Sequence, residues 1–169
     1  NRPIEKVLKD ATLVFLVQDK KVLLARKTRY IGEGRWNGYG GGVEKGQGLI
    51  ECAISECEQE SGIKIMSADL QKVAEVTFHN IKTDGEQFSC LVHVFIAERW
   101  VGEPVESEEM ATPTWFPFDQ LPVTEMMPAD SIWVPLVLSG KKIIGEAHYG
   151  PFQKTLLKPV VVNEVRDFN

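Results

Sequence analysis

The sequence lacks the features that would place it in a membrane or on a nucleic acid. Its longest apolar runs, residues 13–17 and 132–138, fall far short of the roughly 20 residues that a membrane-spanning helix needs. Basic residues are in deficit, with 19 Lys and Arg against 24 Asp and Glu and a formal net charge of -5. Nucleic-acid polymers and membrane surfaces both select a basic face. We therefore expect neither as a partner, whereas a small anionic ligand held by a local cluster stays open.

Cysteine is scarce and follows no metal-binding spacing. The three cysteines, Cys52, Cys57 and Cys90, are odd in number and include no Cys-x-x-Cys pair. We interpret them as reduced, buried thiols of a cytoplasmic protein, in preference to a redox or metal role.

The chain also lacks repeats, low-complexity stretches and long linkers, so we expect a single domain over residues 1–169. Hydrophobic periodicity and turn residues predict strands at residues 13–17, 22–25, 73–78, 88–97, 114–116, 143–149 and 156–162, and helices at residues 49–61 and 131–138. Strands outnumber helices and do not alternate regularly with them. This pattern predicts an α+β fold in which a mixed sheet lies between helices.

Single residues mark the expected helix ends. Gly62 suits the left-handed position that follows the helix at residues 49–61. Asp130 suits the N-cap of the helix at residues 131–138. In the first helix a core-facing stripe is predicted at Ile50, Ala53, Ile54, Cys57 and Ser61.

The helix at residues 49–61 concentrates negative charge. Its glutamates are Glu51, Glu56, Glu58 and Glu60, with no Lys or Arg among them. Glu56 and Glu60 lie one turn apart, where like charges repel by a few tenths of a kcal/mol. The helix dipole adds about 0.3–1 kcal/mol against each acid near the C-terminus. A hard divalent cation would offset this repulsion; the alternative is a solvated acidic face. The glycine-dense residues 38–46 favour the cation, because glycine lets the backbone approach a ligand closely.

From residue 41 to residue 63 the sequence resembles the Nudix box, G-x5-E-x7-R-E-U-x-E-E-x-G-U, in which U is aliphatic. The matching residues are Gly41, Glu56, Glu60, Gly62 and Ile63. The departures are Gln47 for Glu, Ser55 for Arg, Gln59 for Glu and, less severely, Cys57 for U.

The resemblance extends beyond the box. Residues 34–41, 60–62, 105–110 and 130–133 are similar, in order and spacing, to segments of the oxidised purine nucleoside triphosphate hydrolases, the 8-oxo-dGTP diphosphatase type of Nudix enzyme. The likeness runs from about residue 13 to residue 138. It implies the Nudix fold, an αβα sandwich, and hydrolysis of a nucleoside triphosphate to a monophosphate and pyrophosphate.

The resemblance also implies a set of site residues. A magnesium or manganese ion would be held by Glu56, Glu60, Glu109 and the Gly40 carbonyl. The cation would activate a water molecule that attacks phosphorus, and either Glu60 or Glu109 would act as the base.

Outside the box, other residues are candidates for substrate binding. Lys27 and Arg29, in the loop before the glycines, could hold the outer phosphates, or they could be solvated loop charges. In the resembling hydrolases a base lies between aromatic walls and is recognised by an Asn and two Asp residues. This chain keeps Asn37, Phe78 and Asp130.

Two further departures lie in the base site implied by the resemblance. Ala129 stands at the position of the first Asp, and Met127 stands at the position of a stacking Trp. Because a site that reads polar edges depends strongly on each hydrogen bond, we expect a different or broader base preference.

The departures in the box affect metal binding more than folding. Gln47 and Ser55 replace two opposite charges together, which leaves no unpaired ion, and a hydrogen bond between the two side chains could replace the ion pair. Gln59 removes a negative charge beside Glu56 and Glu60, so we expect an active enzyme with weaker metal affinity.

Three functions stay open at this point. The chain could release pyrophosphate from a nucleoside triphosphate, cleave another nucleoside diphosphate linked to a sugar or a second nucleotide, or bind nucleotides without catalysis. We expect a small-molecule nucleotide as the substrate and a monomer or homodimer as the functional form.

Overall fold

The computed structural model describes residues 7–168, which form one mixed β-sheet with a helix on each face. In chain order the strands are β1 (Asp10–Gln18), β2 (Lys21–Lys27), β3 (Trp36–Asn37), β4 (Tyr39–Gly42), β5 (Leu70–Ile81), β6 (Gln87–Ala97), β7 (Met110–Pro117), β8 (Lys142–His148) and β9 (Val161–Val165). The helices are α1 (Leu49–Ser61) and α2 (Asp130–Leu138), and the 3-10 turns are η1 (Ser67–Asp69), η2 (Val123–Glu125) and η3 (Pro151–Gln153).

The strand order is β3-β2-β1-β6-β5-β8-β9, with β4 paired to β1 and β7 paired to β2. The pairs β1–β6 and β5–β8 are parallel and the others are antiparallel. Strand β1 therefore lies at the centre of the sheet. Its one edge pairs with β6 along almost its whole length, and its other edge pairs first with β4 and then with β2.

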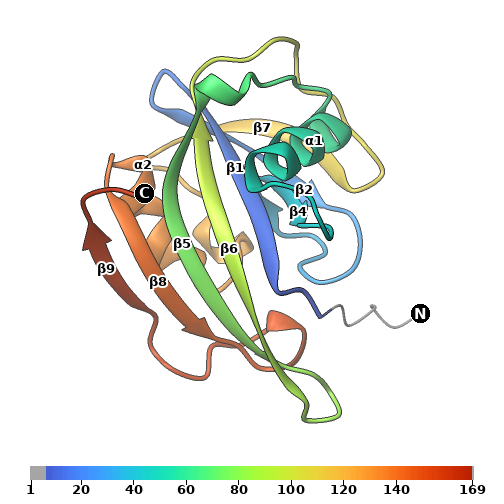
Figure 1. Cartoon of the computed structure of the whole chain (residues 1–169), viewed down its shortest axis with the longest axis vertical. Coiled ribbons are helices and arrows are strands. Elements are labelled where there is room, and N and C mark those ends of the chain that lie inside the picture. The colour runs from blue at the N-terminus through green and yellow to red at the C-terminus, as the bar shows by residue number, and fades with distance from the viewer. Residues whose placement is uncertain (1–6, 169) are drawn as a thin grey trace.

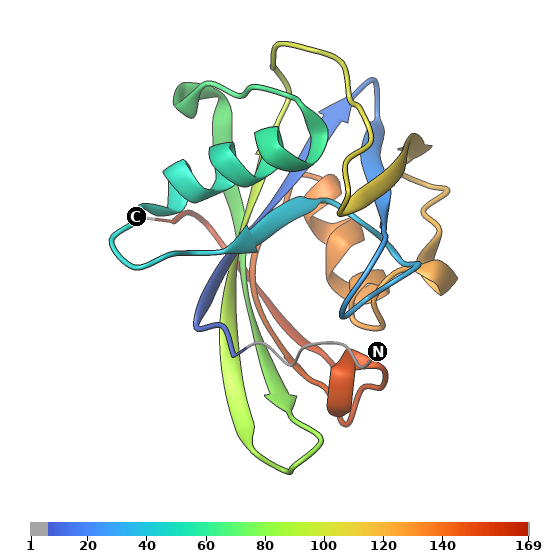
Figure 2. The same ribbon diagram turned by 90° about the vertical axis from the view of Figure 1, so that its right-hand side faces the viewer.

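The two helices cover opposite faces of this sheet, as the view in Figure 2 shows from the side. Helix α1 lies over β1 and β4, and α2 packs against the other face (Figure 1). Within residues 7–168, no helix is long and apolar enough to cross a membrane. The predicted α+β class, with a mixed sheet between helices, is confirmed.

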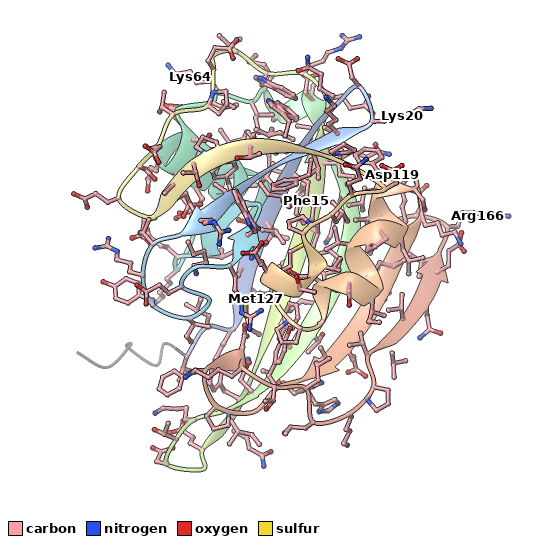
Figure 3. The ribbon with its side chains drawn as sticks, turned by 180° about the vertical axis from the view of Figure 1, so that it is seen from behind. Phe15, Lys20, Lys64, Asp119, Met127 and Arg166 are labelled. Carbon is pink, nitrogen blue, oxygen red and sulfur yellow. The ribbon has the colours of Figure 1, made fainter. Side chains whose placement is uncertain are left out.

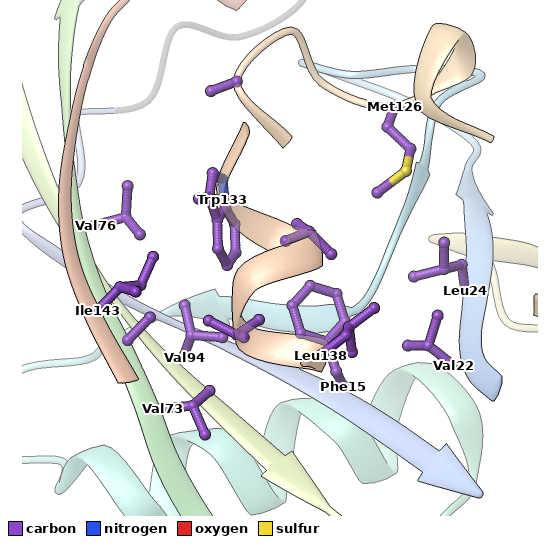
Figure 4. Packing of buried hydrophobic residues seen from close by; sticks show 14 of the residues in the cluster. Phe15, Val22, Leu24, Val73, Val76, Val94, Met126, Trp133, Leu138 and Ile143 are labelled. Carbon is purple, nitrogen blue, oxygen red and sulfur yellow. The ribbon is translucent and has the colours of Figure 1, made fainter. Parts of the chain in front are cut away.

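Each helix packs on an apolar cluster of its own, on its face of the sheet. On the α2 side, Trp133 packs with Phe15 at a ring-centroid distance of 6.0 Å, and Val94 and Ile143 extend the cluster across the sheet (Figure 4). On the α1 side, the helix buries Cys52, Ala53, Cys57 and Ser61. The three cysteines are buried and free, as expected. Ile50 is 37% exposed, so its place in the predicted core stripe is wrong.

Helix α1 begins and ends as its sequence predicts. The Glu51 carboxylate lies 3.5 Å from Gly48 N, which precedes the first turn. Gly62 adopts a left-handed φ of 78° and donates its N–H to Glu58 O at 2.8 Å. The glycine ends the helix because other residues pay a steric cost in that conformation.

The glycine-dense stretch is not a loop. Residues 39–42 form β4, whose Gly40 is paired with Leu13 of β1. A Cβ atom at Gly40 would lie 1.9 Å from Thr12 O, and one at Gly38 would lie 2.6 Å from Val14 O. Glycine is needed here because the backbones of β1 and β4 approach more closely than a side chain allows. The final predicted strand also starts later, at Val161, after the proline at position 159 that cannot donate to a ladder.

We predict that Gly40→Ala destabilises the fold by about 3 kcal/mol, because the new methyl group must push β4 away from β1. Urea unfolding followed by tryptophan fluorescence measures this change. The matched control is Gly48→Ala, because a Cβ at Gly48 meets nothing within 4 Å. Equal midpoints for the two variants would contradict the close approach of the strands.

Candidate active site

A single cleft of about 890 Å³ collects the residues that the sequence singled out. It lies between α1, the loop after β2, the floor of β5 and β6, and the start of α2. The predicted site residues that line it are Lys27, Arg29, Asn37, Gly40, Glu56, Glu60, Phe78, Glu109, Met127 and Asp130. Carboxylates lie at its α1 end, and aromatic and amide side chains lie toward β5 and α2.

Glu60 is the most perturbed carboxyl at the acidic end. Its Oε1 accepts a hydrogen bond from Gly40 N at 3.0 Å. Burial is the largest influence and raises the pKa of Glu60 to about 7, and Glu56 and Glu109 act in the same direction. The Gly40 N–H and Lys27 favour the charged form and act against it. A carboxyl with this pKa can accept a proton near neutral pH, as a general base must.

Glu56 lies one helical turn before Glu60 and covers β4 at Gly41. A Cβ atom at Gly41 would lie 2.7 Å from both Cδ and Oε2 of Glu56. Because glycine has no such atom, the carboxylate rests directly on the backbone of the strand. The glycine therefore positions the first carboxylate of the site.

Glu109, which precedes β7, is held by an ion pair. Its Oε1 lies 2.6 Å from Arg29 Nη2 and 3.2 Å from Arg29 Nε. This hydrogen bond raises the pKa of Arg29. Within residues 7–168, no three acidic, His or Cys side chains lie close enough together to ligate one ion. The predicted ligand set stays a prediction. In this structure Glu109 is paired with Arg29, and this pair would compete with phosphate for Arg29.

The hydrogen bond between Gln47 and Ser55 that could have replaced the ion pair does not form. Gln47 Oε1 instead accepts from Glu44 N at 3.0 Å and closes the turn before α1. Ser55 Oγ accepts from Gln59 Nε2 at 3.2 Å, one helical turn away. Each side chain has a nearer local partner, so no side-chain bond joins the loop to the helix at these positions. Gln59 lines the cleft, as expected for a residue beside Glu56 and Glu60.

Asp130 dominates the other end of the cleft. It lies inside the first turn of α2 and not at the N-cap as predicted, because the helix starts one residue early, at the N-cap Ala129. Its Oδ2 accepts from Met127 N at 3.3 Å. Burial raises the pKa of Asp130 to about 7, and the Met127 N–H, the Trp133 indole and Arg35 act in the opposite direction. Trp133 Nε1 has no hydrogen-bond partner among the described residues. Its N–H dipole therefore lowers the pKa of Asp130 without a regular hydrogen bond.

Met127 and Asn37 frame the same end. Met127 is 8% exposed and its Sδ packs against Gly32 in the loop after β2 (Figure 3). Asn37 Oδ1 accepts from Gly38 N at 2.8 Å, which fixes the orientation of its amide. The Asn37 nitrogen is thereby turned away from the backbone of Gly38.

Sequence reasoning missed further lining residues, among them Trp133, Tyr149, Asn80 and Gln153. The Tyr149 ring stacks on Phe78 at 5.7 Å and 17°, and its Oη accepts from Ala129 N at 2.9 Å. Asn80 could have been found, because it follows Phe78 by two residues in a strand and so shares its face. Tyr149 directly follows β8 and Gln153 is the last residue of η3, and no local pattern marks them as cleft residues.

We predict that the free energy of unfolding of Asp130→Asn, measured relative to that of the wild type, increases as pH rises from 4 to 8. Since the folded pKa of about 7 exceeds the ordinary aspartate value of 3.8, the contribution of the protonated acid to wild-type stability is full below pH 3.8 and is lost as pH rises through 7. The shift corresponds to at most about 4 kcal/mol. Urea unfolding at several pH values measures the difference. Asp119→Asn, at an exposed position, is the control; parallel profiles for all three proteins would contradict the buried acid.

Comparisons with known proteins agree with this geometry. A family model described as the NUDIX domain matches residues 7–137. The chain is 42% identical over 134 residues to the oxidized purine nucleoside triphosphate hydrolase of Mus musculus, covering 79% of this chain and 82% of that protein. It is 40% identical to the protein of the same name from Danio rerio, with the same coverage. A solved structure, the mMutator MutT protein from Bacillus halodurans, superposes with a TM-score of 0.75 at 25% identity, over 92% of this chain and 98% of that chain. These matches confirm the predicted fold, and the chain belongs to the Nudix hydrolase family.

Proposed function

We propose that this Nudix hydrolase cleaves a purine nucleoside triphosphate, with water, into the nucleoside monophosphate and pyrophosphate. The observation that carries the proposal is one cleft with a carboxylate end at α1 and a base-sized aromatic and polar end at β5 and α2. The names of the mouse and zebrafish relatives support this substrate class. A cytoplasmic location is part of the proposal, supported by the three buried thiols.

The donor chemistry of the acidic end fits a magnesium or manganese ion. Carboxylate and carbonyl oxygens are the ligands that such hard cations prefer. Glu56 and Glu109 both act to raise the pKa of Glu60, after the larger effect of burial, which is consistent with three acidic side chains within electrostatic range of one another. The residues that would hold the cation are Glu56, Glu60, Glu109 and the Gly40 carbonyl.

A bound cation supplies activation of a water molecule and neutralisation of charge on the phosphate oxygens. The chain's own residues supply the rest. Glu60 accepts the proton of the attacking water in this proposal, supported by its pKa near 7 and its fixed hydrogen bond to Gly40 N. Glu109 is the alternative base, and its ion pair with Arg29 would have to open first. Lys27 and Arg29 line the same cleft and would hold the phosphates.

The decisive experiment is a panel of nucleotides with magnesium and then manganese. The panel contains the common purine and pyrimidine triphosphates, 8-oxo-dGTP, a nucleotide sugar and a dinucleotide. We expect pyrophosphate and a monophosphate from purine triphosphates. Cleavage of the sugar or dinucleotide substrates alone would favour the second class of Nudix enzyme. Binding of triphosphates without turnover would instead favour a non-catalytic module, to which Gln47, Ser55 and Gln59 point.

We further predict that Gln59→Glu increases metal affinity. The new carboxylate would add attraction to the cation on the order of 1 kcal/mol, about fivefold in the dissociation constant. It would also add repulsion with Glu56 and Glu60 when no cation is bound. The melting temperature should therefore fall slightly without magnesium and rise with magnesium, because a ligand that binds the native state stabilises it.

Gln71→Glu is the matched control, because Gln71 is also exposed but lies on β5 outside the cleft. It adds the same charge and should leave the magnesium dependence of the melting temperature unchanged. A Gln59→Glu variant that melts higher without metal would show that position 59 does not share the field of the two glutamates.

A further inference from the structure

The floor of the cleft contains an amide pair that the proposed chemistry does not use. Asn80 of β5 is 6% exposed, and Gln153 of η3 is half-buried. Gln153 Nε2 donates to Asn80 Oδ1 at 2.9 Å, and both residues line the cleft. Figures 1 and 2 show η3 beside the C-terminal end of β5, where this bond joins them.

Asn80 is held firmly by its neighbours. Its Nδ2 donates to Phe78 O at 3.0 Å while its Oδ1 accepts from Gln153. Both ends of the amide are thus engaged with the protein, which fixes the orientation of the group. A buried amide with a fixed orientation fixes its partner in turn.

The protein uses only part of the hydrogen-bonding capacity of the Gln153 side chain. Its bond to Asn80 takes one of the two Nε2 hydrogens. Among residues 7–168, no side-chain or backbone group bonds its Oε1 or its second Nε2 hydrogen. A donor and an acceptor therefore remain together in one plane, on a side chain that lines the cleft.

The backbone that presents Gln153 is unusual. Phe152 and Gln153 have φ values of 57° and 55°, so two consecutive residues other than glycine are left-handed. This conformation costs free energy for residues that carry a Cβ atom. Such costs concentrate at ligand-binding segments. Here the conformation turns the Gln153 side chain toward Asn80.

The amide pair lies next to the aromatic pair of the base site. Asn80 lies two residues after Phe78, on the same face of β5. Gln153 lies four residues after Tyr149, at the end of the 3-10 turn η3. Phe78 and Tyr149 stack on each other, and Tyr149 Oη reaches the start of α2, where Asp130 lies. Asp130 and Gln153 both line the cleft that contains this aromatic pair, so both are candidates to contact the edges of a bound base.

Resting on the proposed function, we propose that Gln153, positioned by Asn80, determines which purine bases this enzyme accepts. A glutamine amide pairs with a base edge that carries a donor beside an acceptor, in the way that amide side chains contact adenine N6 and N7. The 6-position of a purine and its adjacent ring nitrogen form such an edge in adenine and, with donor and acceptor exchanged, in guanine. The amide thereby adds a second recognition group to the one at Asp130.

Metal-free titration calorimetry with product-like ligands tests this. The ligands are the 5′-monophosphates of adenosine, guanosine and the 6-unsubstituted purine riboside, with ribose 5-phosphate as the base-free probe. We expect the wild type to bind the better of the two natural bases about tenfold more tightly than the unsubstituted purine. Gln153→Met keeps the length of the side chain but removes its amide, and should reduce this ratio to threefold or less. Binding of ribose 5-phosphate should stay the same.

Gln120→Met is the matched control, because Gln120 is exposed and lies outside the cleft; it should keep the wild-type ratio. Asn80→Leu removes the positioning bond and should reduce the ratio as well. Because Asn80 acts through Gln153, the double variant should discriminate no less than Gln153→Met alone.

A ratio that is unchanged in Gln153→Met, or a wild type without base discrimination, overturns the inference. Pyrophosphate release is measured separately, so the two proposals fail in different ways. If base discrimination depends on Gln153 but no pyrophosphate is released, only the proposed activity is contradicted. If pyrophosphate is released but base discrimination is unchanged in Gln153→Met, only the proposed role of Gln153 is contradicted.

Discussion

The close pairing of β4 with β1 is the contact on which the arrangement of the site depends. Gly38 and Gly40 let β4 lie against the carbonyl groups of β1 at distances that no side chain permits. This pairing sets the backbone N–H of Gly40 in front of Glu60. It also brings Gly41 under Glu56, so both carboxylates of α1 are located by a strand that consists largely of glycine.

The same arrangement concentrates charge that the protein compensates only in part. Burial and the neighbouring acids raise the pKa of Glu60, while Lys27 and one peptide N–H oppose them. Glu109 has a full partner in Arg29, at 2.6 Å. The acidic end therefore contains one carboxylate in an ion pair, Glu109, and one buried carboxyl, Glu60, whose pKa is raised to about 7. Binding a cation and a polyphosphate together would change both, because the cation attracts Glu109 and the phosphates attract Arg29.

How much of this could be predicted from the sequence depends on the range of the interactions. Helix α1, its end at Gly62 and the first hairpin follow from local patterns, and their predictions hold. No strand was predicted at the glycine stretch, because its extended conformation is imposed by β1, whose paired residues lie 25 to 31 positions earlier in the chain. The Gln47–Ser55 bond that could have replaced the ion pair does not form, because each side chain finds a partner within four residues. Tyr149 and Gln153 enter the cleft through pairing of β5 with β8, which no local signal reveals.

The base end shows how this chain differs from the hydrolases that it resembles. Where the resemblance places a first carboxylate, Ala129 contributes only a backbone N–H, and that group is already bonded to Tyr149 Oη. Asp130 is fully enclosed, with a pKa of about 7, so near neutral pH it is present in both protonation states. A group that switches between acceptor and donor discriminates weakly between bases that differ at one edge. Fixed amides do not change with pH, so we expect selection between purines that persists across neutral pH to come from Asn37 and from Gln153, which Asn80 positions.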